Sequence, residues 1–167
     1  MFTAVVAVLS QIAIPMPSGV PVTLQTLAVA LCGYVLGSKK GAVSLLVYAL
    51  LGAVGAPVFA NFKGGLGAIA GPTGGFIWGF IFMAFLCGLG IESKHKWLAV
   101  VLGIAGVLVC HACGAAQFAI IKGNGFWSSA LLVSVPYLVK DFLSVIIALG
   151  AAALIRSRIK VTAAANQ

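Results

Sequence analysis

Long apolar runs, separated by short groups of polar or basic residues, constrain the fold of this chain most strongly. Of its 167 residues, 62% are hydrophobic and 7% are charged. A water-soluble domain of this size needs a largely polar surface, which this composition does not supply. The sequence therefore predicts an all-α integral membrane protein. No polar linker divides the chain, so we expect one compact domain over residues 1–167.

Six apolar segments are expected to form the transmembrane helices of a compact bundle. Prolines, glycine-containing turns and charged residues set their boundaries. A proline-rich loop, residues 15–21, cannot be helical and separates the first two segments. The glycines at 75 and 79 lie four residues apart, which is typical of a close contact between helices. The expected helices cover residues 2–14, 23–36, 41–59, 74–90, 97–121 and 131–155.

The basic residues divide unevenly between the two sides of this bundle. The connections after the second and fourth expected helices and the C-terminal tail hold Lys39, Lys40, Lys94, Lys96, Arg156, Arg158 and Lys160. The alternate connections hold only Lys63 and Lys122. Because cytoplasmic loops of membrane proteins carry an excess of Lys and Arg, this division predicts that both termini are cytoplasmic. The proline-rich loop and the segment around Lys63 then lie at the outer face.

The net charge of +8 does not indicate a nucleic-acid partner. The charges lie singly or in short groups between apolar runs, as topology determinants do, so membrane lipid is the expected surrounding. The chain also has no G-x-x-x-x-G-K-[ST] motif and thus no nucleotide-binding P-loop. Any uphill transport therefore draws its energy from a partner or from an ion gradient.

A glycine-rich segment, residues 59–76 (FANFKGGLGAIAGPTGGF), interrupts the apolar pattern. Glycine permits left-handed backbone and close approach of the chain to a ligand, and Pro72 biases Gly71 away from helix. Irregular backbone in a membrane protein persists where water or other protein satisfies its polar groups. The segment is therefore either a surface loop or the wall of a binding site, and its glycine density and flanking aromatics favour the wall.

Asp141 is the one acidic residue outside the charged turn at residues 92–96, and it lies about three turns into the sixth expected helix. An ionisable group within a membrane span is costly and is by default a functional hypothesis. The alternative is a structural pair with Lys140. Adjacent residues on a helix point about 100° apart, so the sequence does not favour a direct pair.

Asn61 and Lys63 are polar groups at the outer end of the third expected helix. Alone, Asn61 fits a turn residue and Lys63 fits a cation that reaches the lipid headgroups. Beside glycine-rich backbone and nearby phenylalanines, they indicate a pocket for a small anion with an apolar body.

The run Cys110-His111-Ala112-Cys113 admits several interpretations. Haem attachment needs a histidine directly after the second cysteine, where Gly114 stands instead. A zinc site needs more ligands, so no metal or other cofactor is expected. A C-x-x-C pair also fits a membrane thiol oxidoreductase, although buried helix packing is the favoured interpretation.

Several motifs carry a specific resemblance. They are residues 21–25 (PVTLQ), 48–52 (YALLG), 55–59 (GAPVF), 64–65 followed by 71–76 (GPTGGF), and 137–141 (YLVKD). Together they resemble the BioY family, the biotin-binding S components of energy-coupling factor (ECF) transporters. The resemblance implies a bacterial cytoplasmic membrane protein that is not an enzyme. It also implies three partners, a transmembrane coupling subunit and two cytoplasmic ATPases.

The resemblance also implies site residues. Asn61 and Asp141 match positions that bind the ureido head of biotin, and Lys63 lies where a basic residue meets the carboxylate. The remaining expected substrate-binding residues are Gln25, Tyr48, Phe62, Gly64 and Gly65. The competing functions are a stand-alone carrier or channel for small solutes and a thiol oxidoreductase that uses Cys110 and Cys113. One departure concerns the first helix, where only Thr3 and Ala7 approximate the small residues by which such components dock.

Overall fold

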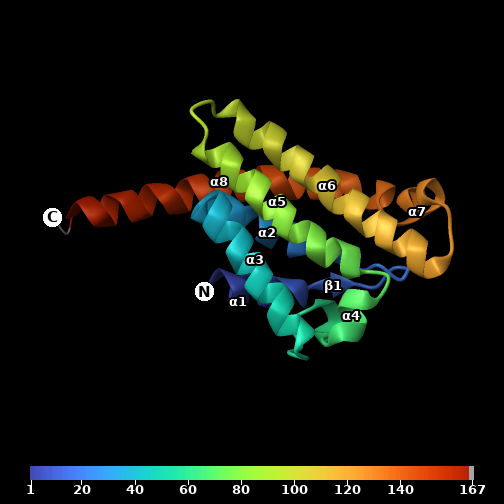
Figure 1. Ribbon diagram of the computed structural model, residues 1–167. Helices are drawn as coiled ribbons and strands as arrows, with labels where there is room; N and C mark the ends of the chain where they lie inside the picture. Colours follow the sequence, from blue (N-terminus) through green and yellow to red (C-terminus); the bar gives the residue numbers. More distant parts are fainter. Residues whose placement is uncertain (166–167) are drawn as a thin grey trace.

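The computed structural model describes the backbone of residues 1–165 and the side chains of residues 1–158. The chain is almost entirely helical, with one two-stranded ribbon (Figure 1). Each of the six expected segments contains a helix, so the prediction of an all-α bundle is confirmed. In chain order the elements are α1 Phe2–Ser10, β1 Ala13–Ile14, β2 Val22–Thr23, α2 Gln25–Leu36, α3 Ser38–Ala53, the 3-10 helix η1 Ala60–Phe62, α4 Leu66–Ala70, α5 Gly74–Glu92, α6 Trp97–Lys122, α7 Phe126–Val133 and α8 Val135–Ala165.

α5 and α6 form the most extensive helix pair of the bundle and lie side by side in Figure 1. A Cβ added at Gly75 would lie 2.2 Å from the carbonyl oxygen of Cys113, and one added at Gly79 would lie 2.7 Å from the Cα of Cys110. No larger side chain fits in that space, and glycine lets the two backbones meet. The expected glycine contact between helices is confirmed for this pair, whose bounds lie within two residues of the prediction.

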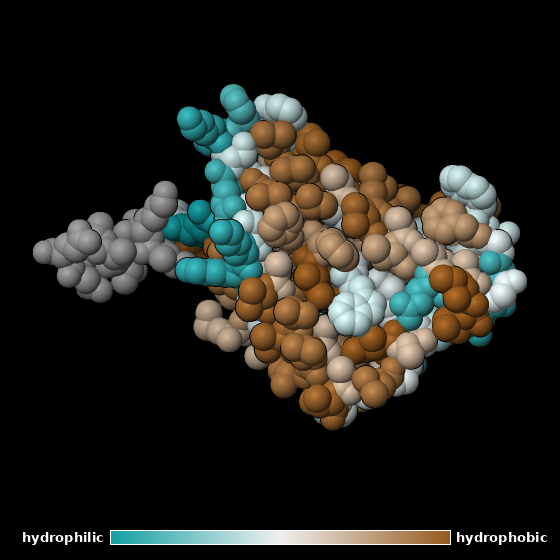
Figure 2. All heavy atoms as spheres, in the orientation of Figure 1, coloured by the Kyte–Doolittle hydropathy of each residue, from teal (hydrophilic) through white to brown (hydrophobic). Residues whose placement is uncertain are grey.

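On the face shown in Figure 2, a broad apolar band lies between two more polar ends. Large apolar side chains are exposed on several helices, among them Val43 and Leu50 on α3, Phe82 on α5 and Ile146 on α8. By length and composition, α5, α6 and residues Val135–Arg158 of α8 are long and apolar enough to cross a membrane. Such a surface is stable in lipid and not in water, so the chain is a membrane protein.

The first two expected helices are shorter than their apolar runs. α1 ends at Ser10, and Ala13 and Ile14 instead pair with β2, with Ala13 opposite Thr23 and Ile14 opposite Val22. Thr23 is therefore in a strand, and α2 begins at Gln25. The prolines of the intervening loop prevent helix on both sides, and the short ribbon pairs backbone groups that a broken helix would leave unpaired.

The third helix begins and ends earlier than predicted. Gly37, with φ 86°, turns the chain directly into α3 at Ser38. Glu92, predicted in a charged turn, instead ends α5, and its carboxylate accepts the Ser38 N–H at 2.8 Å and the Ser38 hydroxyl at 2.8 Å. A carboxylate at a helix N-terminus satisfies an unpaired N–H and complements the helix dipole. The expected turn at residues 38–40 is thus the first turn of α3.

The sixth expected helix is divided in two. α7 ends at Val133, the helical conformation is interrupted at Ser134, and α8 begins at Val135. Pro136 stands in the first turn of α8, where its missing N–H costs nothing. Asp141 therefore lies nearer to a helix N-terminus than predicted. α8 also continues to Ala165, so most of the expected tail is helical, and Figure 1 shows its last turns extending beyond the other helices.

The basic groups gather at one end of the bundle, as the charge pattern predicts. Glu92 caps α3 beside Lys39, and Arg156 donates to the carbonyl oxygen of Tyr34 at the end of α2 at 3.0 Å. These contacts bring the start of α3 and the ends of α2, α5 and α8 together. The side chain of Lys160, which was grouped with these residues, lies outside the described side chains. The side of the membrane that this end faces remains a prediction.

Candidate functional site

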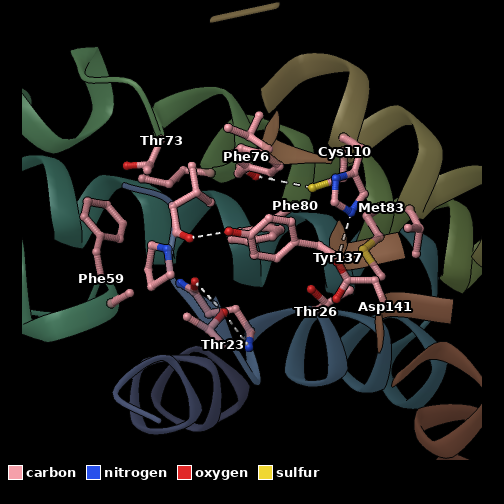
Figure 3. A pocket seen from close by; sticks show the side chains of 18 of the residues that line it. Thr23, Thr26, Phe59, Thr73, Phe76, Phe80, Met83, Cys110, Tyr137 and Asp141 are labelled. Atoms are coloured by element: carbon pink, nitrogen blue, oxygen red, sulfur yellow. Dashed lines mark hydrogen bonds and ion pairs between the residues drawn. The ribbon is translucent and has the colours of Figure 1, made fainter. Parts of the chain in front are cut away.

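A cavity opens at the end of the bundle opposite the basic cluster, between the β1–β2 ribbon, the glycine-rich segment and the middle of the helices (Figure 3). Its empty volume is about 830 Å³, counting the space open to solvent at its mouth. The lining residues are Val20, Pro21, Thr23, Gln25, Thr26, Phe59, Ala60, Asn61, Lys63, Ala68, Thr73, Phe76, Ile77, Phe80, Met83, Val107, Cys110, His111, Val133, Tyr137, Lys140 and Asp141.

Hydrogen bonds from α8 side chains hold the proline-rich loop and the adjacent strand β2. The Tyr137 hydroxyl donates to the carbonyl oxygen of Val20 at 2.6 Å and lies 2.8 Å from the Ser18 hydroxyl. The Lys140 ammonium donates to the carbonyl oxygen of Thr23 at 2.9 Å. Both α8 residues lie in the YLVKD motif, so this motif anchors one wall of the cavity.

Buried amide and phenol groups hold the opposite wall. The Gln25 amide donates to the Tyr48 hydroxyl at 2.8 Å, and that hydroxyl donates to the carbonyl oxygen of Val58 at 3.0 Å. Gln117 on α6 donates to the carbonyl oxygens of Ile69 at 2.7 Å and Gly71 at 2.8 Å. The glycine-rich segment is therefore fixed by side chains from neighbouring helices, and part of it lines the cavity. That this cavity binds a ligand stays a prediction.

The innermost polar group of the cavity is a pair of buried side chains. Asp141, 4% exposed, lies on α8, and His111, 7% exposed, lies on α6. Nε2 of His111 is 2.9 Å from Oδ2 of Asp141. The imidazole packs edge-on against the Phe76 ring, with 5.6 Å between the ring centroids. A hydrogen bond between an imidazole and a carboxylate is strong in a low-dielectric interior, so it fixes the positions of both side chains.

The ion pair that the sequence does not favour is present, so that expectation was wrong. The Lys140 ammonium lies against Oδ1 of Asp141. The lysine side chain is long enough to bend back over its neighbour, and it is 30% exposed while the carboxylate is 5% exposed. Oδ1 is thus occupied on one side by the Lys140 ammonium.

The mouth of the cavity has an unusual backbone. Asn61 has φ 58° and ψ 39°, and Phe62 has φ 55°. Asn tolerates the left-handed region, but a bulky residue there is strained by about 1–3 kcal/mol. Gln11, directly after α1, holds this turn: its amide oxygen accepts the Phe62 N–H at 2.8 Å, and its amide nitrogen donates to the carbonyl oxygen of Phe59 at 3.2 Å.

The cavity brings part of the predicted site together. Asn61 and Lys63 lie at its exposed mouth, Gln25 in its wall and Asp141 at its buried end. These side chains come from a 3-10 turn, from α2 and from α8. Whether they bind a ligand is not tested by their position, and their role stays a prediction.

The remaining predicted residues surround the cavity without lining it. Tyr48 is fully buried behind Gln25, whereas the Phe62 side chain is 71% exposed. A Cβ at Gly64 would lie 2.4 Å from the carbonyl oxygen of Ala56, and Gly65 has φ 90°. These glycines are required by close packing and by the turn itself.

Cys110 and Cys113 do not form a disulfide. Cys110 is buried in the cavity wall, and its thiol lies 3.7 Å from the carbonyl oxygen of Phe76. Both residues lie in the middle of α6, where Cys113 faces Gly75 on α5. Helix packing therefore accounts for the pair.

His111 and Thr26 are cavity residues that sequence reasoning did not assign to the site. Figure 3 shows Thr26, Tyr137 and Asp141 on the same side of the cavity. The signal for His111 was a buried histidine in an apolar helix, but its partner lies 30 residues away on another helix. Only the packing of α6 against α8 joins them.

Comparison with known proteins gives concordant results. Residues 1–161 match the model of the BioY family. A biotin transporter BioY of Thermotoga maritima is 47% identical over 114 residues, covering 68% of this chain and 67% of that protein. A biotin transporter BioY of Rhodobacter capsulatus is 35% identical over 162 residues, covering 88% of this chain and 85% of that protein.

The fold also has a solved counterpart. A crystal structure of the S-component for biotin from an ECF-type ABC transporter superposes with a TM-score of 0.82 at 25% identity, covering 93% of this chain and 87% of that chain. The arrangement of helices around the cavity is therefore that of an S component.

Proposed function

The chain belongs to the BioY family, and on that premise we propose that it captures biotin in this cavity and mediates its uptake as the substrate-binding subunit of an ECF-type ABC importer. Biotin has a cyclic urea head, an apolar thioether ring and a short chain that ends in a carboxylate. The cavity offers a buried polar end, apolar walls that include Phe59, Phe76 and Phe80, and a basic residue at its mouth.

The observation that carries this proposal is the buried carboxylate of Asp141 at the inner end of the cavity, held between His111 and Lys140. A carboxylate oxygen has more than one lone pair, so Oδ1 can accept a further hydrogen bond while it contacts Lys140. In our proposal a ureido N–H of biotin donates to this oxygen. The Lys140 ammonium pairs with this carboxylate, whose oxygens can only accept when ionised.

At the mouth, we propose that Lys63 and the Asn61 amide face the biotin carboxylate. The resemblance assigns Asn61 to the ureido head, but Asn61 lies at the exposed mouth beside Lys63 and not at the buried end with Asp141. Gln25 lines the wall, and Tyr48, Gly64 and Gly65 shape it from behind. Phe62 covers the opening when the ligand is bound. These roles follow from the resemblance and from the location of each residue.

Three partners complete the proposed transporter: a transmembrane coupling subunit and two cytoplasmic ATPases, all in the bacterial cytoplasmic membrane or at its inner surface. The chain lacks a P-loop, so ATP hydrolysis has to take place on other subunits. The basic end of the bundle, with both termini, would face the cytoplasm and the acidic lipid headgroups there.

Neither competing function finds support. A thiol oxidoreductase needs an accessible cysteine pair, and Cys110 is buried against α5. A stand-alone carrier needs its own coupling route. Active accumulation of biotin in liposomes that contain this chain alone, driven by a proton gradient, would establish that alternative instead.

Calorimetry on the purified protein tests the proposal. We expect biotin to bind with a stoichiometry of one, without ATP, and pantothenate at the same concentration to give no heat. A protein that stays folded yet binds no biotin would refute the function. Cysteine labelling tests the topology: positions near Lys39 and Lys94 should react from the cytoplasm, and positions near Lys63 and Lys122 from outside.

A further inference from the structure

Nδ1 of His111 is an unpartnered polar atom at the buried end of the cavity. The residue is 7% exposed and lines the cavity, and Nδ1 has no hydrogen-bond partner among the residues that the structure describes. The other ring nitrogen is occupied by Asp141. The large majority of buried polar side-chain atoms in proteins have a hydrogen-bond partner. This nitrogen therefore indicates a partner that enters from the cavity.

The partner on Nε2 fixes the chemistry of Nδ1. A carboxylate can only accept, so the 2.9 Å contact to Oδ2 of Asp141 assigns the proton to Nε2. In the neutral imidazole, Nδ1 is then an acceptor. With a neutral imidazole, the buried end of the cavity thus presents two acceptors: Nδ1 of His111, which has no partner among the described residues, and Oδ1 of Asp141, which contacts Lys140 and has a further lone pair. The bond between Nε2 and Oδ2 holds the two side chains together.

We propose that His111 is a ligand-binding residue whose Nδ1 accepts the second ureido N–H of biotin, while Oδ1 of Asp141 accepts the first. The inference rests on the proposed function and adds a residue and a chemical selectivity to it. A cyclic urea carries two N–H donors on either side of its carbonyl, and two fixed acceptors select for both. A head group with one N–H would leave one acceptor buried and unpaired, and should bind roughly tenfold or more weakly.

The alternative role for His111 is to position Asp141 without touching the ligand. Two substitutions separate the roles because each amide reproduces one ring nitrogen. His111→Gln places an amide where Nε2 stood, so it keeps the bond to Asp141 and removes the acceptor at Nδ1. His111→Asn places an amide oxygen where Nδ1 stood and removes the bond to Asp141.

Binding of biotin to both variants is measured by calorimetry, with thermal unfolding as the control for folding. If Nδ1 contacts the ligand, His111→Gln should bind biotin roughly tenfold or more weakly than the parent, and His111→Asn should recover part of that loss. Parental affinity in His111→Gln would overturn the proposal, because His111 would then only position Asp141.

Two analogues of biotin make the assignment sharper. In each, an oxygen atom replaces one of the two ureido N–H groups to give a cyclic carbamate. The parent should discriminate against both. His111→Gln should lose its discrimination against one isomer and keep it against the other. Equal discrimination against both isomers in His111→Gln would also overturn the proposal.

The same measurements distinguish an error in the role of His111 from an error in the proposed function. If the parent binds no biotin, the function itself is wrong. If the parent binds biotin and His111→Gln binds it equally well, the function stands and only the role of His111 falls.

Discussion

The two ends of the cavity are built in opposite ways. At the buried end, His111 and Asp141 project from two long helices and are 7% and 4% exposed. At the mouth, Asn61 and Lys63 are exposed and lie in or beside a 3-10 turn, η1, in which two residues have positive φ. One end is a fixed pair of acceptors in a low dielectric, and the other is a strained turn in contact with water.

Because of this difference, we expect the two ends to control different properties of biotin binding: its affinity and its rates of entry and exit. Hydrogen bonds to charged groups in a dry site contribute about 1.5–3 kcal/mol each, whereas a charge near water is screened over a Debye length of about 8 Å. We therefore expect the buried end to determine how tightly biotin binds. The mouth, where Gln11 bonds to the backbone of the turn, should determine how fast biotin enters and leaves.

The largest effect should come from Asp141→Asn. The substitution keeps the shape of the side chain but replaces one acceptor oxygen with a donor, so a charge-assisted bond to biotin is lost. Affinity should fall by about one to two decades, since such a bond contributes about 1.5–3 kcal/mol. Calorimetry measures the change.

Ser144→Ala is the matched control for this variant. Ser144 is also buried on α8, but its hydroxyl donates to the carbonyl oxygen of Lys140 at 2.9 Å and does not line the cavity. It should bind biotin like the parent. If Asp141→Asn, while folded, also bound like the parent, Asp141 would be a packing residue and the contrast between the two ends would disappear.

An intermediate effect should come from Gln11→Ala. The variant removes the acceptor of the Phe62 N–H and the donor to Phe59, so the strained turn loses its support. Net loss of a neutral hydrogen bond costs about 0.5–1.5 kcal/mol, and affinity should fall by roughly threefold to tenfold. The change should appear in the dissociation rate, measured by stopped-flow fluorescence.

Thr3→Ala serves as the control for Gln11→Ala, because the Thr3 hydroxyl on α1 donates to the carbonyl oxygen of Ser44 at 3.1 Å, away from the cavity. An unchanged dissociation rate in Gln11→Ala would mean that the turn keeps its conformation without Gln11. The mouth would then be as rigid as the buried end.

The same contrast explains what the sequence could and could not predict. α5 and α6 were predicted within two residues because glycine, charge and apolar content all change at their ends. The start of α3 was not predicted correctly, because the residue that caps it, Glu92, lies 54 residues away in the chain. The break at Ser134 was also missed, although Pro136, in the first turn of α8, is a signal for a helix boundary in this apolar run.

The residues of the cavity also fall into those that the sequence could predict and those that it could not. Asn61, Lys63 and Asp141 were predicted as site residues because polar groups are rare in apolar sequence and because their motifs resemble a family; the structure places all three in the cavity lining. The pairing of His111 with Asp141 depends on the register between α6 and α8, which no local pattern encodes. The positive φ of Phe62 was equally unpredictable, because a hydrogen bond from Gln11 stabilises it.

The smallest effect should come from Lys63→Met, which removes the cation at the mouth but keeps most of the apolar side chain. Lys63 is exposed, so water and salt screen its attraction for the biotin carboxylate, and affinity should fall by threefold or less at physiological ionic strength. The dependence on salt is the sharper measurement. Raising ionic strength should weaken biotin binding slightly in the parent and in Asp141→Asn alike, but not in Lys63→Met, because only the contact at the mouth is screened. Lys122→Met, which removes an exposed lysine at the end of α6 that does not line the cavity, is the control for a general effect of net charge. If Lys63→Met lost more affinity than Asp141→Asn, the carboxylate of biotin and not its urea would dominate binding, and the assignment of the two ends would have to be reversed.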